Sequence, residues 1–280
     1  MTITILTDNT PGDDKELKSE HGFSAYIQTN HTNVLCDMGA SDAFMYNSQK
    51  LGIDLDTIDF AFISHGHSDH TGGLQVFFDK VKDKDIYIPH GITSEKYYSL
   101  RHESKRDIST ILSEEANNSH RLKFISESKW LSQDMAVIKN VYDNYSKPNG
   151  NRHLYKATKG LEVEDDFSHE QSLAITTKKG LAIISPCSHC GITNIMKSCC
   201  LFTGQSNVYA FIGGLHIVDD EKTEQESEKI ISEISKEFPE TLIITGHCTC
   251  NRAKDVLKSK SNNIMFFKTG SSFSEDMFAI

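Results

Sequence analysis

Residues 65–70 read His65-Gly66-His67-Ser68-Asp69-His70 and directly follow the apolar run 58–63, which predicts a buried strand. Polar groups are costly at the end of such a strand unless something binds them. Imidazole and carboxylate groups are ligands suited to Zn²⁺, Fe and Mn²⁺. If the stretch bends as a turn, two of its ligands can face one ion and two a neighbouring ion. Chance clustering among the 13 histidines of the chain is the alternative, but this spacing at a strand end favours a metal site.

Three more histidines, His189, His216 and His247, each stand a few residues after an apolar run that predicts a strand. A metal cleft gathers side chains from several strand ends, whereas a core histidine would fall within an element. We therefore predict His189 and His247 as metal ligands. For His216 the sequence leaves metal ligation and proton transfer to a leaving group open, because a neutral imidazole can do either.

The histidine turn, with Thr71-Gly72-Gly73 after it, resembles the signature of the metallo-β-lactamase fold superfamily. The segments 20–24 and 35–39 look like the opening strand pair of that superfamily. Later motifs resemble the branch of dihydropterin-6-methyl-β-ribofuranosylaminobenzene phosphate synthase-like proteins, and the resemblance runs from about Leu6 to about Phe267. Those motifs are Pro186-Cys187-Ser188-His189-Cys190-Gly191-Ile192, Gly213-Gly214-Leu215-His216 and Gly246-His247-Cys248-Thr249.

The resemblance implies an α/β fold, a four-layer αββα sandwich with two divalent metal ions at one edge of the paired sheets. Zinc is the favoured ion, with iron and manganese as alternatives. In the superfamily a hydroxide between the ions is the nucleophile, because the metals lower the pKa of water toward about 7. Asp69 and His216 are the residues predicted to take part in catalysis. The implied ligands are His65, His67 and His189 for one ion and Asp69, His70 and His247 for the other.

One part of the superfamily pattern does not transfer to this chain. Most members place a bridging Asp in a Gly-Asp pair between the third and last histidine ligands, and no such pair stands there. Either His189 is the third ligand and His216 occupies the later strand end, or the turn Cys187-Ser188-His189 takes the bridging position. The second alignment would move His169 or Glu170 into the third-ligand place. We favour the first, because His169 lies in an acidic stretch and is expected to be a solvated turn residue.

The seven cysteines are an odd number, which argues against a disulfide framework. Cys187-x-x-Cys190 has the spacing of zinc ligands, and Cys248-x-Cys250 is the matching half of a four-thiolate site. Both pairs flank a histidine that is already predicted as a ligand. We therefore favour packing roles near a metal centre, with Cys187 as the one candidate for direct coordination.

Asp37 lies in the turn Cys36-Asp37-Met38-Gly39. It resembles the acidic residue that, in this superfamily, lies behind the metal turn and orients a ligand histidine. A solvated aspartate in a surface turn is the alternative. His21 and His90 also lie near strand ends and are expected to be bystanders.

Composition and charge limit the classes of partner. The chain has 280 residues, which suits one domain, predicted to span 1–280. Its 39 acidic and 29 basic residues give a net charge of −10, which disfavours nucleic acid as a partner. The start lacks the features of a signal peptide, and no apolar stretch approaches the roughly 20 residues of a membrane helix. We expect a cytoplasmic protein with a small-molecule substrate and no membrane partner, and the sequence leaves a homo-oligomer open.

Strand and helix patterns alternate along the chain, as in an α/β fold. The stretch 141–160, rich in Asn, Lys and Tyr, is typical of a long loop that covers an active site. Predicted strands are 3–6, 24–28, 33–36, 86–90, 122–125, 136–138, a hairpin over 171–185, 208–212 and 241–245. Predicted helices are 41–52, 73–81, about 91–121, 221–238 and 252–258.

These observations predict a metal-dependent hydrolase, or a transferase that uses the same centre, acting on a small anionic molecule such as a phosphoester. The branch resemblance implies condensation of a dihydropterin pyrophosphate with an aminobenzene ribose phosphate. A non-catalytic metal-binding or sensor protein would account for the missing bridging Asp. A di-iron redox protein of the same fold would normally carry a flavin-binding domain, for which the chain has no room.

Overall fold

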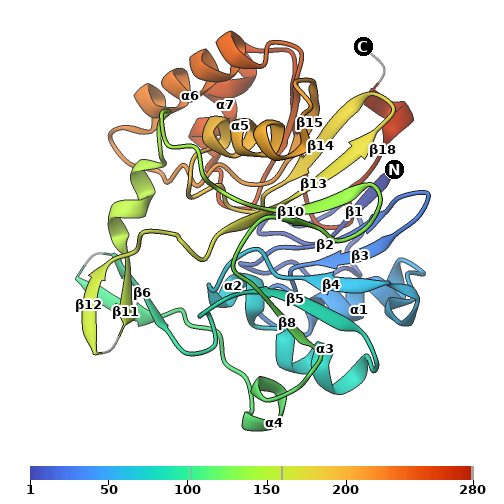
Figure 1. Ribbon diagram of the computed structural model, residues 1–280. Coiled ribbons are helices and arrows are strands. Elements are labelled where there is room, and N and C mark those ends of the chain that lie inside the picture. Colours follow the sequence, from blue (N-terminus) through green and yellow to red (C-terminus); the bar gives the residue numbers. More distant parts are fainter. Residues whose placement is uncertain (102, 159, 279–280) are drawn as a thin grey trace. The chain divides into compact units, whose positions relative to one another are not determined.

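The computed structural model describes residues 1–101, 103–158 and 160–278 (Figure 1). Contacts divide the chain into two compact units. The single domain predicted over 1–280 stays a prediction, and its last two residues lie outside the described ranges. Unit 1 is Met1–Ser126, His153–Asp165 and Lys268–Ile280, and unit 2 is Glu127–Arg152 and Asp166–Phe267.

Unit 1 contains a seven-stranded sheet in the order β18-β1-β2-β3-β4-β5-β8. The pairs on the β18 side, up to β3, are antiparallel, and the pairs from β3 to β8 are parallel. Neighbouring parallel strands end at the same edge of a sheet, so the residues that follow β3 and β4 meet there. The bounds are β1 (Thr2–Thr7), β2 (Ser24–Gln28), β3 (Asn33–Cys36), β4 (Phe60–Phe62), β5 (Asp85–Pro89), β8 (Leu122–Ile125) and β18 (Ser272–Ser274).

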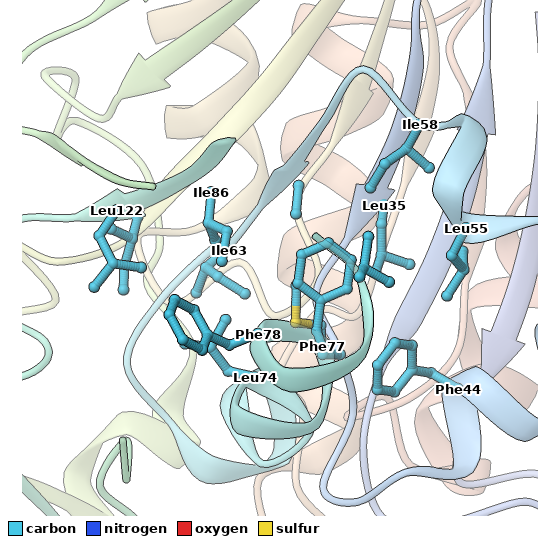
Figure 2. Close-up of a cluster of buried hydrophobic side chains, with 14 of the residues drawn as sticks. Leu35, Phe44, Leu55, Ile58, Ile63, Leu74, Phe77, Phe78, Ile86 and Leu122 are labelled. Atoms are coloured by element: carbon cyan, nitrogen blue, oxygen red, sulfur yellow. The ribbon is translucent and has the colours of Figure 1, made fainter. Parts of the chain in front are cut away.

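Helices α1 (Ala43–Lys50) and α3 (Leu74–Lys80) supply apolar side chains to the core of unit 1, and both lie where helices are predicted. Figure 2 shows Phe78 of α3 beside Ile63, which follows β4, with Phe44 of α1 in the same buried cluster. Burial of a phenylalanine side chain contributes about 1.5–3 kcal/mol. This packing fixes α3 directly behind the segment that carries the histidine turn.

The helix predicted over about 91–121 is wrong; residue 102 of that range lies outside the described residues. The described part of the range forms two strands and one short helix. The strands belong to a four-stranded antiparallel sheet, ordered β12-β11-β6-β7. The bounds are β6 (Lys96–Arg101), β7 (Ser104–Asp107), α4 (Glu114–Asn117), β11 (Leu154–Thr158) and β12 (Leu161–Glu164).

Unit 2 contains a second seven-stranded sheet in the order β17-β16-β15-β14-β13-β10-β9. The strands from β14 to β17 pair parallel, and β9, β10 and β13 continue the sheet in antiparallel pairs. The hairpin predicted over 171–185 is found as β13 and β14. The bounds are β9 (Lys129–Trp130), β10 (Met135–Lys139), β13 (Gln171–Thr177), β14 (Gly180–Ile184), β15 (Val208–Ile212), β16 (Leu242–Thr245) and β17 (Ile264–Phe266).

Three helices of unit 2, α5 (Ile192–Thr203), α6 (Thr223–Glu237) and α7 (Asn251–Lys260), lie together beside this sheet (Figure 1). The sequence patterns predict α6 and α7 but not α5. Gly191 and Gly204 flank α5 with φ angles of 88° and 71°, the left-handed region in which glycine is unstrained. Within the described ranges no helix is long and apolar enough to cross a membrane.

Gly72 permits a close contact between the histidine turn and the loop after β3. A Cβ atom at Gly72 would lie 2.3 Å from the carbonyl oxygen of Ala40. We expect Gly72→Ala to lower the free energy of unfolding by about 1–3 kcal/mol, the usual cost of overpacking. Urea denaturation measures the change. Gly52→Ala is the control, because a Cβ atom at Gly52 would meet nothing within 4 Å, so that only the backbone strain at its φ of 72° remains. A smaller loss in Gly72→Ala than in this control would contradict the steric argument.

Candidate metal centre

The predicted metal turn follows β4 in unit 1 and leads into the one-turn helix α2 (Ser68–Thr71). The carbonyl oxygen of His67 accepts hydrogen bonds from the backbone N–H groups of His70 and Thr71 at 3.0 and 3.1 Å. The ring centroid of His65 lies 4.6 Å from that of His67 and 4.1 Å from that of His70. The turn therefore brings three buried imidazoles together.

Asp37 lies directly after β3 and is fully buried behind this turn. Its Oδ1 accepts a hydrogen bond from the Ser64 backbone N–H at 2.7 Å. Its Oδ2 accepts from the Ser64 hydroxyl at 2.6 Å and lies 2.7 Å from Nδ1 of His70. The Ser64 hydroxyl in turn lies 2.8 Å from Nδ1 of His65. One carboxylate thus orients His70 directly and His65 through Ser64, and it is not a solvated turn residue.

These contacts determine the tautomers of both imidazoles. A carboxylate only accepts hydrogen bonds, so His70 carries a proton on Nδ1 and donates it to Asp37. The Ser64 hydroxyl uses its single hydrogen for Asp37, so it accepts from His65, which is therefore also protonated on Nδ1. Nε2 of each ring then carries the lone pair, which is the form in which histidine binds a metal ion.

Two carboxylates of unit 1 approach the same histidines. Oδ2 of Asp69 lies 3.6 Å from Nε2 of His70 and 3.5 Å from Nε2 of His21. Oδ2 of Asp165 lies 3.5 Å from Nε2 of His67. His21 is expected from the sequence to be a bystander, but it contacts a predicted site residue. Asp165 is absent from the sequence-based predictions.

Gly66 has a packing role in the turn. A Cβ atom at Gly66 would lie 2.7 Å from Cε2 of Tyr97 and 3.0 Å from the side chain of Ile92. Tyr97 is fully buried, and its ring centroid lies 5.7 Å from that of His67. Glycine therefore lets β6 approach the turn closely, and the tyrosine ring limits the positions open to His67.

In unit 2 the remaining predicted site residues follow three neighbouring parallel strands. His189 comes after β14, His216 after β15 and His247 after β16. The backbones of Ser188, His216 and His247 have φ angles of 58°, 48° and 48°, and Asp37 of unit 1 has 54°. Non-glycine residues in this region cost of order 1–3 kcal/mol each, and such strain concentrates at functional sites.

The turn that carries His189 is held by two side chains of unit 2. The carboxylate of Glu170 accepts hydrogen bonds from the backbone N–H groups of His189 and Cys190, both at 2.7 Å. Nδ2 of Asn151 donates to the carbonyl oxygen of His189 at 2.8 Å, and its Oδ1 lies 3.0 Å from Nδ1 of His189. The first of these contacts orients the Asn151 amide, so its Oδ1 accepts a hydrogen bond from the Nδ1–H group of His189. His189 therefore also presents the lone pair on Nε2.

Glu170 is 3% exposed and His169 is 2% exposed, so the expected solvated position of His169 is wrong. Burial raises the pKa of the Glu170 carboxyl, while the hydrogen bonds from Cys190 and His189 lower it in part. Both oxygens of Glu170 are used to hold the backbone of the His189 turn. The choice of His189 over His169 or Glu170 as the third ligand stays a prediction.

His216 lies beside His189, with ring centroids 4.3 Å apart. Cys187, His216 and Cys248 also form a group in which one donor atom of each lies within 4.8 Å of the others. Burial alone would raise the pKa of the Cys248 thiol, but the nearby side chains of Cys187 and His216 and the charges of His247 and His216 hold that pKa well below its usual range. In the described chain no such three-donor group includes Cys190 or Cys250, so the four-thiolate alternative finds no support.

Two residues that hold the predicted ligands, Ser64 and Asn151, are missing from the sequence-based predictions, and a third, Glu170, is named there only as an alternative ligand. Ser64 is the residue before His65, and a hydroxyl beside a predicted ligand is a weak but readable signal. Asn151 lies in the stretch predicted as a loop over 141–160, where many residues are Asn. Nothing in the local sequence distinguishes it from its neighbours.

Comparison with known proteins identifies the family and similar relatives. A family model described as the metallo-beta-lactamase superfamily matches residues 19–176. The 7,8-dihydropterin-6-methyl-4-(beta-D-ribofuranosyl)-aminobenzene-5'-phosphate synthase of Methanocaldococcus jannaschii is 29% identical over 273 residues, 91% of this chain and 90% of that protein. The uncharacterized protein MJ0448 of the same organism is 27% identical over 278 residues, 96% of this chain and 98% of that protein.

Among solved structures, Tm1679, described as a metal-dependent hydrolase of the beta-lactamase superfamily, matches with a TM-score of 0.83 and 29% identity over 98% of both chains. This match confirms the predicted α/β fold of the metallo-β-lactamase type. The residues matched by the family model include Asp37 and the whole histidine turn. The chain belongs to the metallo-β-lactamase superfamily.

Proposed function

We propose that this protein is a metal-dependent enzyme that hydrolyses a small anionic substrate or transfers a group from it at the same centre. The observation that carries the proposal is the shared tautomer of His65, His70 and His189, each of which meets a hydrogen-bond acceptor at Nδ1. Each ring thereby offers Nε2 to a metal ion.

The residues fit divalent metal ions. Imidazole nitrogens with a carboxylate are ligands that zinc accepts readily, and iron and manganese are the alternatives. A divalent ion there supplies a Lewis acid and lowers the pKa of water enough to give a nucleophile near neutral pH. The proposed ligands are those predicted from the sequence: His65, His67, Asp69, His70, His189 and His247.

Asp69 is the proposed acid–base residue, because its side chain is 21% exposed while the histidines of the turn are buried. Its Oδ2 lies 3.5 Å from Nε2 of His21, whose side chain is 71% exposed. A proton taken up by Asp69 can therefore pass through His21 to solvent. His216 is the second residue proposed to act in catalysis, either as a proton donor or as a metal ligand, and its ring centroid lies 4.3 Å from that of His189.

The substrate class rests on relatives. The name of the Methanocaldococcus jannaschii synthase describes a product that contains a ribofuranosyl group and a phosphate. This name supports a phosphorylated, anionic substrate. A transferase of that kind would join an aromatic amine to a pterin methyl carbon: a C–N bond forms, a C–O bond breaks, and pyrophosphate leaves as the amine loses a proton. A hydrolase would use water in place of the amine.

We expect His67→Ala and Asp69→Ala to lose metal and turnover together, with little change in the far-ultraviolet circular dichroism spectrum. The ligands lie in a turn, whereas the core is built from strands and helices, so the loss should be local. Plasma mass spectrometry measures the metal content, and thermal melting shows whether the fold is kept. His31→Ala, at an exposed position, is the control; unchanged metal content in Asp69→Ala would contradict its assignment.

Assays with different substrates distinguish hydrolysis from group transfer. Bis(p-nitrophenyl) phosphate, p-nitrophenyl acetate and a homoserine lactone test hydrolysis, and pyrophosphate release from a dihydropterin pyrophosphate with and without an aromatic amine tests transfer. Turnover that requires the amine supports the transferase. Metal-loaded protein without turnover in any of these assays would favour a non-catalytic metal-binding protein.

A further inference from the structure

We propose that Cys187, His216 and Cys248 bind a thiophilic divalent ion such as Zn²⁺ through two sulfurs and one ring nitrogen, as a site of their own within unit 2. The proposal does not rest on the ligand set proposed for the histidine turn. One donor atom from each of the three residues lies within 4.8 Å of the others. It assigns His216 as a ligand, which decides between the two roles that the sequence leaves open.

The sheet of unit 2 explains why these residues meet. Each follows one of three adjacent strands, β14, β15 and β16, which pair in parallel. The carboxyl ends of parallel strands lie at one edge of a sheet, where ligand sites of α/β proteins form. Residues that are about 30 positions apart along the chain are thereby fixed as neighbours by the sheet register.

Hydrogen bonds join the three loops to one another. The Gly214 N–H donates to the Pro186 carbonyl oxygen at 2.7 Å, and the Ser188 hydroxyl donates to the Gly214 carbonyl oxygen at 2.7 Å. The Leu215 N–H donates to the hydroxyl of Thr249 at 2.9 Å. The donors are therefore held on a rigid frame, as precise metal sites require.

Space for the Cys248 sulfur comes from a glycine. A Cβ atom at Gly214 would lie 2.4 Å from Sγ of Cys248, so any larger residue would displace the sulfur. The backbone N–H of His216 donates to the same sulfur at 3.2 Å. Hydrogen bonds of this kind to sulfur tune metal-bound thiolates.

The ring of His216 is buried next to the two sulfurs. The residue is 7% exposed, and neither ring nitrogen has a hydrogen-bond partner by distance and angle in the part of the chain that the structure describes. A buried imidazole without partners costs about 1–3 kcal/mol. A metal ion that uses one nitrogen offsets that cost, and one nitrogen of the ring lies within 4.8 Å of both sulfurs.

The donor set indicates the kind of ion. Two sulfurs and one imidazole select thiophilic ions such as Zn²⁺ over Mg²⁺ or Ca²⁺. Zn–S bonds of about 2.3 Å and Zn–N bonds of about 2.0–2.1 Å place tetrahedral ligands about 3.3–3.8 Å apart. Side-chain adjustments of about an ångström close the group around an ion. Three protein ligands leave the fourth position open, as in catalytic zinc sites.

Cobalt substitution tests the site without any measurement of turnover. Protein purified with chelator and loaded with Co²⁺ should show the intense near-ultraviolet charge-transfer band of a thiolate–cobalt bond, which histidine and carboxylate ligands do not give. Cys187→Ser and Cys248→Ser should each lose the band, and the double variant should bind one equivalent of cobalt less. Cys250→Ser is the matched control, because this neighbouring thiol is outside the group, and it should keep both.

Three results would overturn the proposal. One is wild-type protein that binds cobalt without the band. Another is a disulfide between Cys187 and Cys248, seen as a mass two hydrogens lower and resistance to iodoacetamide. The third is loss of the band in a His65→Ala/His67→Ala variant, since the sulfurs would then be ligands of an ion at the histidine turn. If that variant keeps the thiolate–cobalt band but loses the metal bound at the histidine turn, the result supports two separate metal sites.

Discussion

Asp37→Asn is expected to lower the metal affinity about 10–100-fold while most of the folding stability is kept. Removal of a residue that orients a metal ligand typically has an effect of this size. Asparagine has nearly the shape of aspartate and tolerates the left-handed backbone that Asp37 adopts, with a φ of 54°. The backbone of the turn should therefore survive the change.

The loss of affinity follows from the tautomer of His70. In Asp37→Asn the Oδ1 position can still accept from the Ser64 N–H, which places an NH₂ group where Oδ2 now lies. That group donates to Nδ1 of His70, so the His70 proton moves to Nε2 and the ring can no longer bind a metal through that nitrogen. The Ser64 hydroxyl also loses its acceptor, and with it the orientation of His65.

Asp37→Ala separates orientation from stability. It removes the acceptor of three buried hydrogen bonds and should cost about 3–5 kcal/mol, because each buried donor left unsatisfied costs about 1–3 kcal/mol. Titration calorimetry with Zn²⁺ and urea denaturation measure the two effects in both variants. Asp83→Asn is the control, because Asp83 is exposed and also has a left-handed backbone, with a φ of 57°. Wild-type affinity in Asp37→Asn would contradict the tautomer argument.

The sequence predicts the part of the site that is local. In His65-Gly66-His67-Ser68-Asp69-His70 the ligands lie in one strand-to-helix turn, so their spacing along the chain determines their spacing in the structure. The histidines of unit 2 are predicted for a related reason. Each follows a strong apolar strand, and parallel strands bring such positions to one edge.

Asp37 is predicted to orient a ligand histidine, but the residues that hold the His189 turn are not predicted in that role, because they are distant along the chain and carry no pattern of their own. Asn151 is 38 residues from His189, and Glu170 is 19 residues from it. Glu170 ends an acidic stretch, and charge runs of this kind are normally solvated. Only the folded chain shows that both of its oxygens face buried N–H groups.

Exposed strands are missed for a different physical reason. All side chains of β7 and β12 are exposed. β7 has no apolar residue and so shows no alternation of apolar and polar residues, whereas β12, Leu161–Glu164, does alternate, but over only four residues. Pairing with β6 and β11 determines their conformation instead. Helix α5 is the opposite case, since it is largely buried and apolar, but the glycines at both of its ends are a readable signal.

Glu170→Ala is expected to lower the free energy of unfolding by about 3–5 kcal/mol. The substitution leaves the buried N–H groups of His189 and Cys190 without their acceptor, and each unsatisfied buried donor costs about 1–3 kcal/mol. Ser188, just before them, already has a strained φ of 58°. Without the carboxylate the turn should relax toward ordinary backbone angles and carry His189 away from its present position.

Glu170→Gln tests whether both hydrogen bonds matter. Its single carbonyl oxygen can accept from one N–H, while its NH₂ group faces the other, so we expect a loss of about 1–3 kcal/mol, smaller than that of alanine. Urea denaturation gives the stabilities, and metal content reports whether His189 keeps its place. Glu240→Ala, at an exposed position of the same unit, should stay within about 0.5 kcal/mol of the wild type. Equal stability of Glu170→Ala and Glu240→Ala would show that the His189 turn holds its shape without this carboxylate, and the argument for Glu170 would fail.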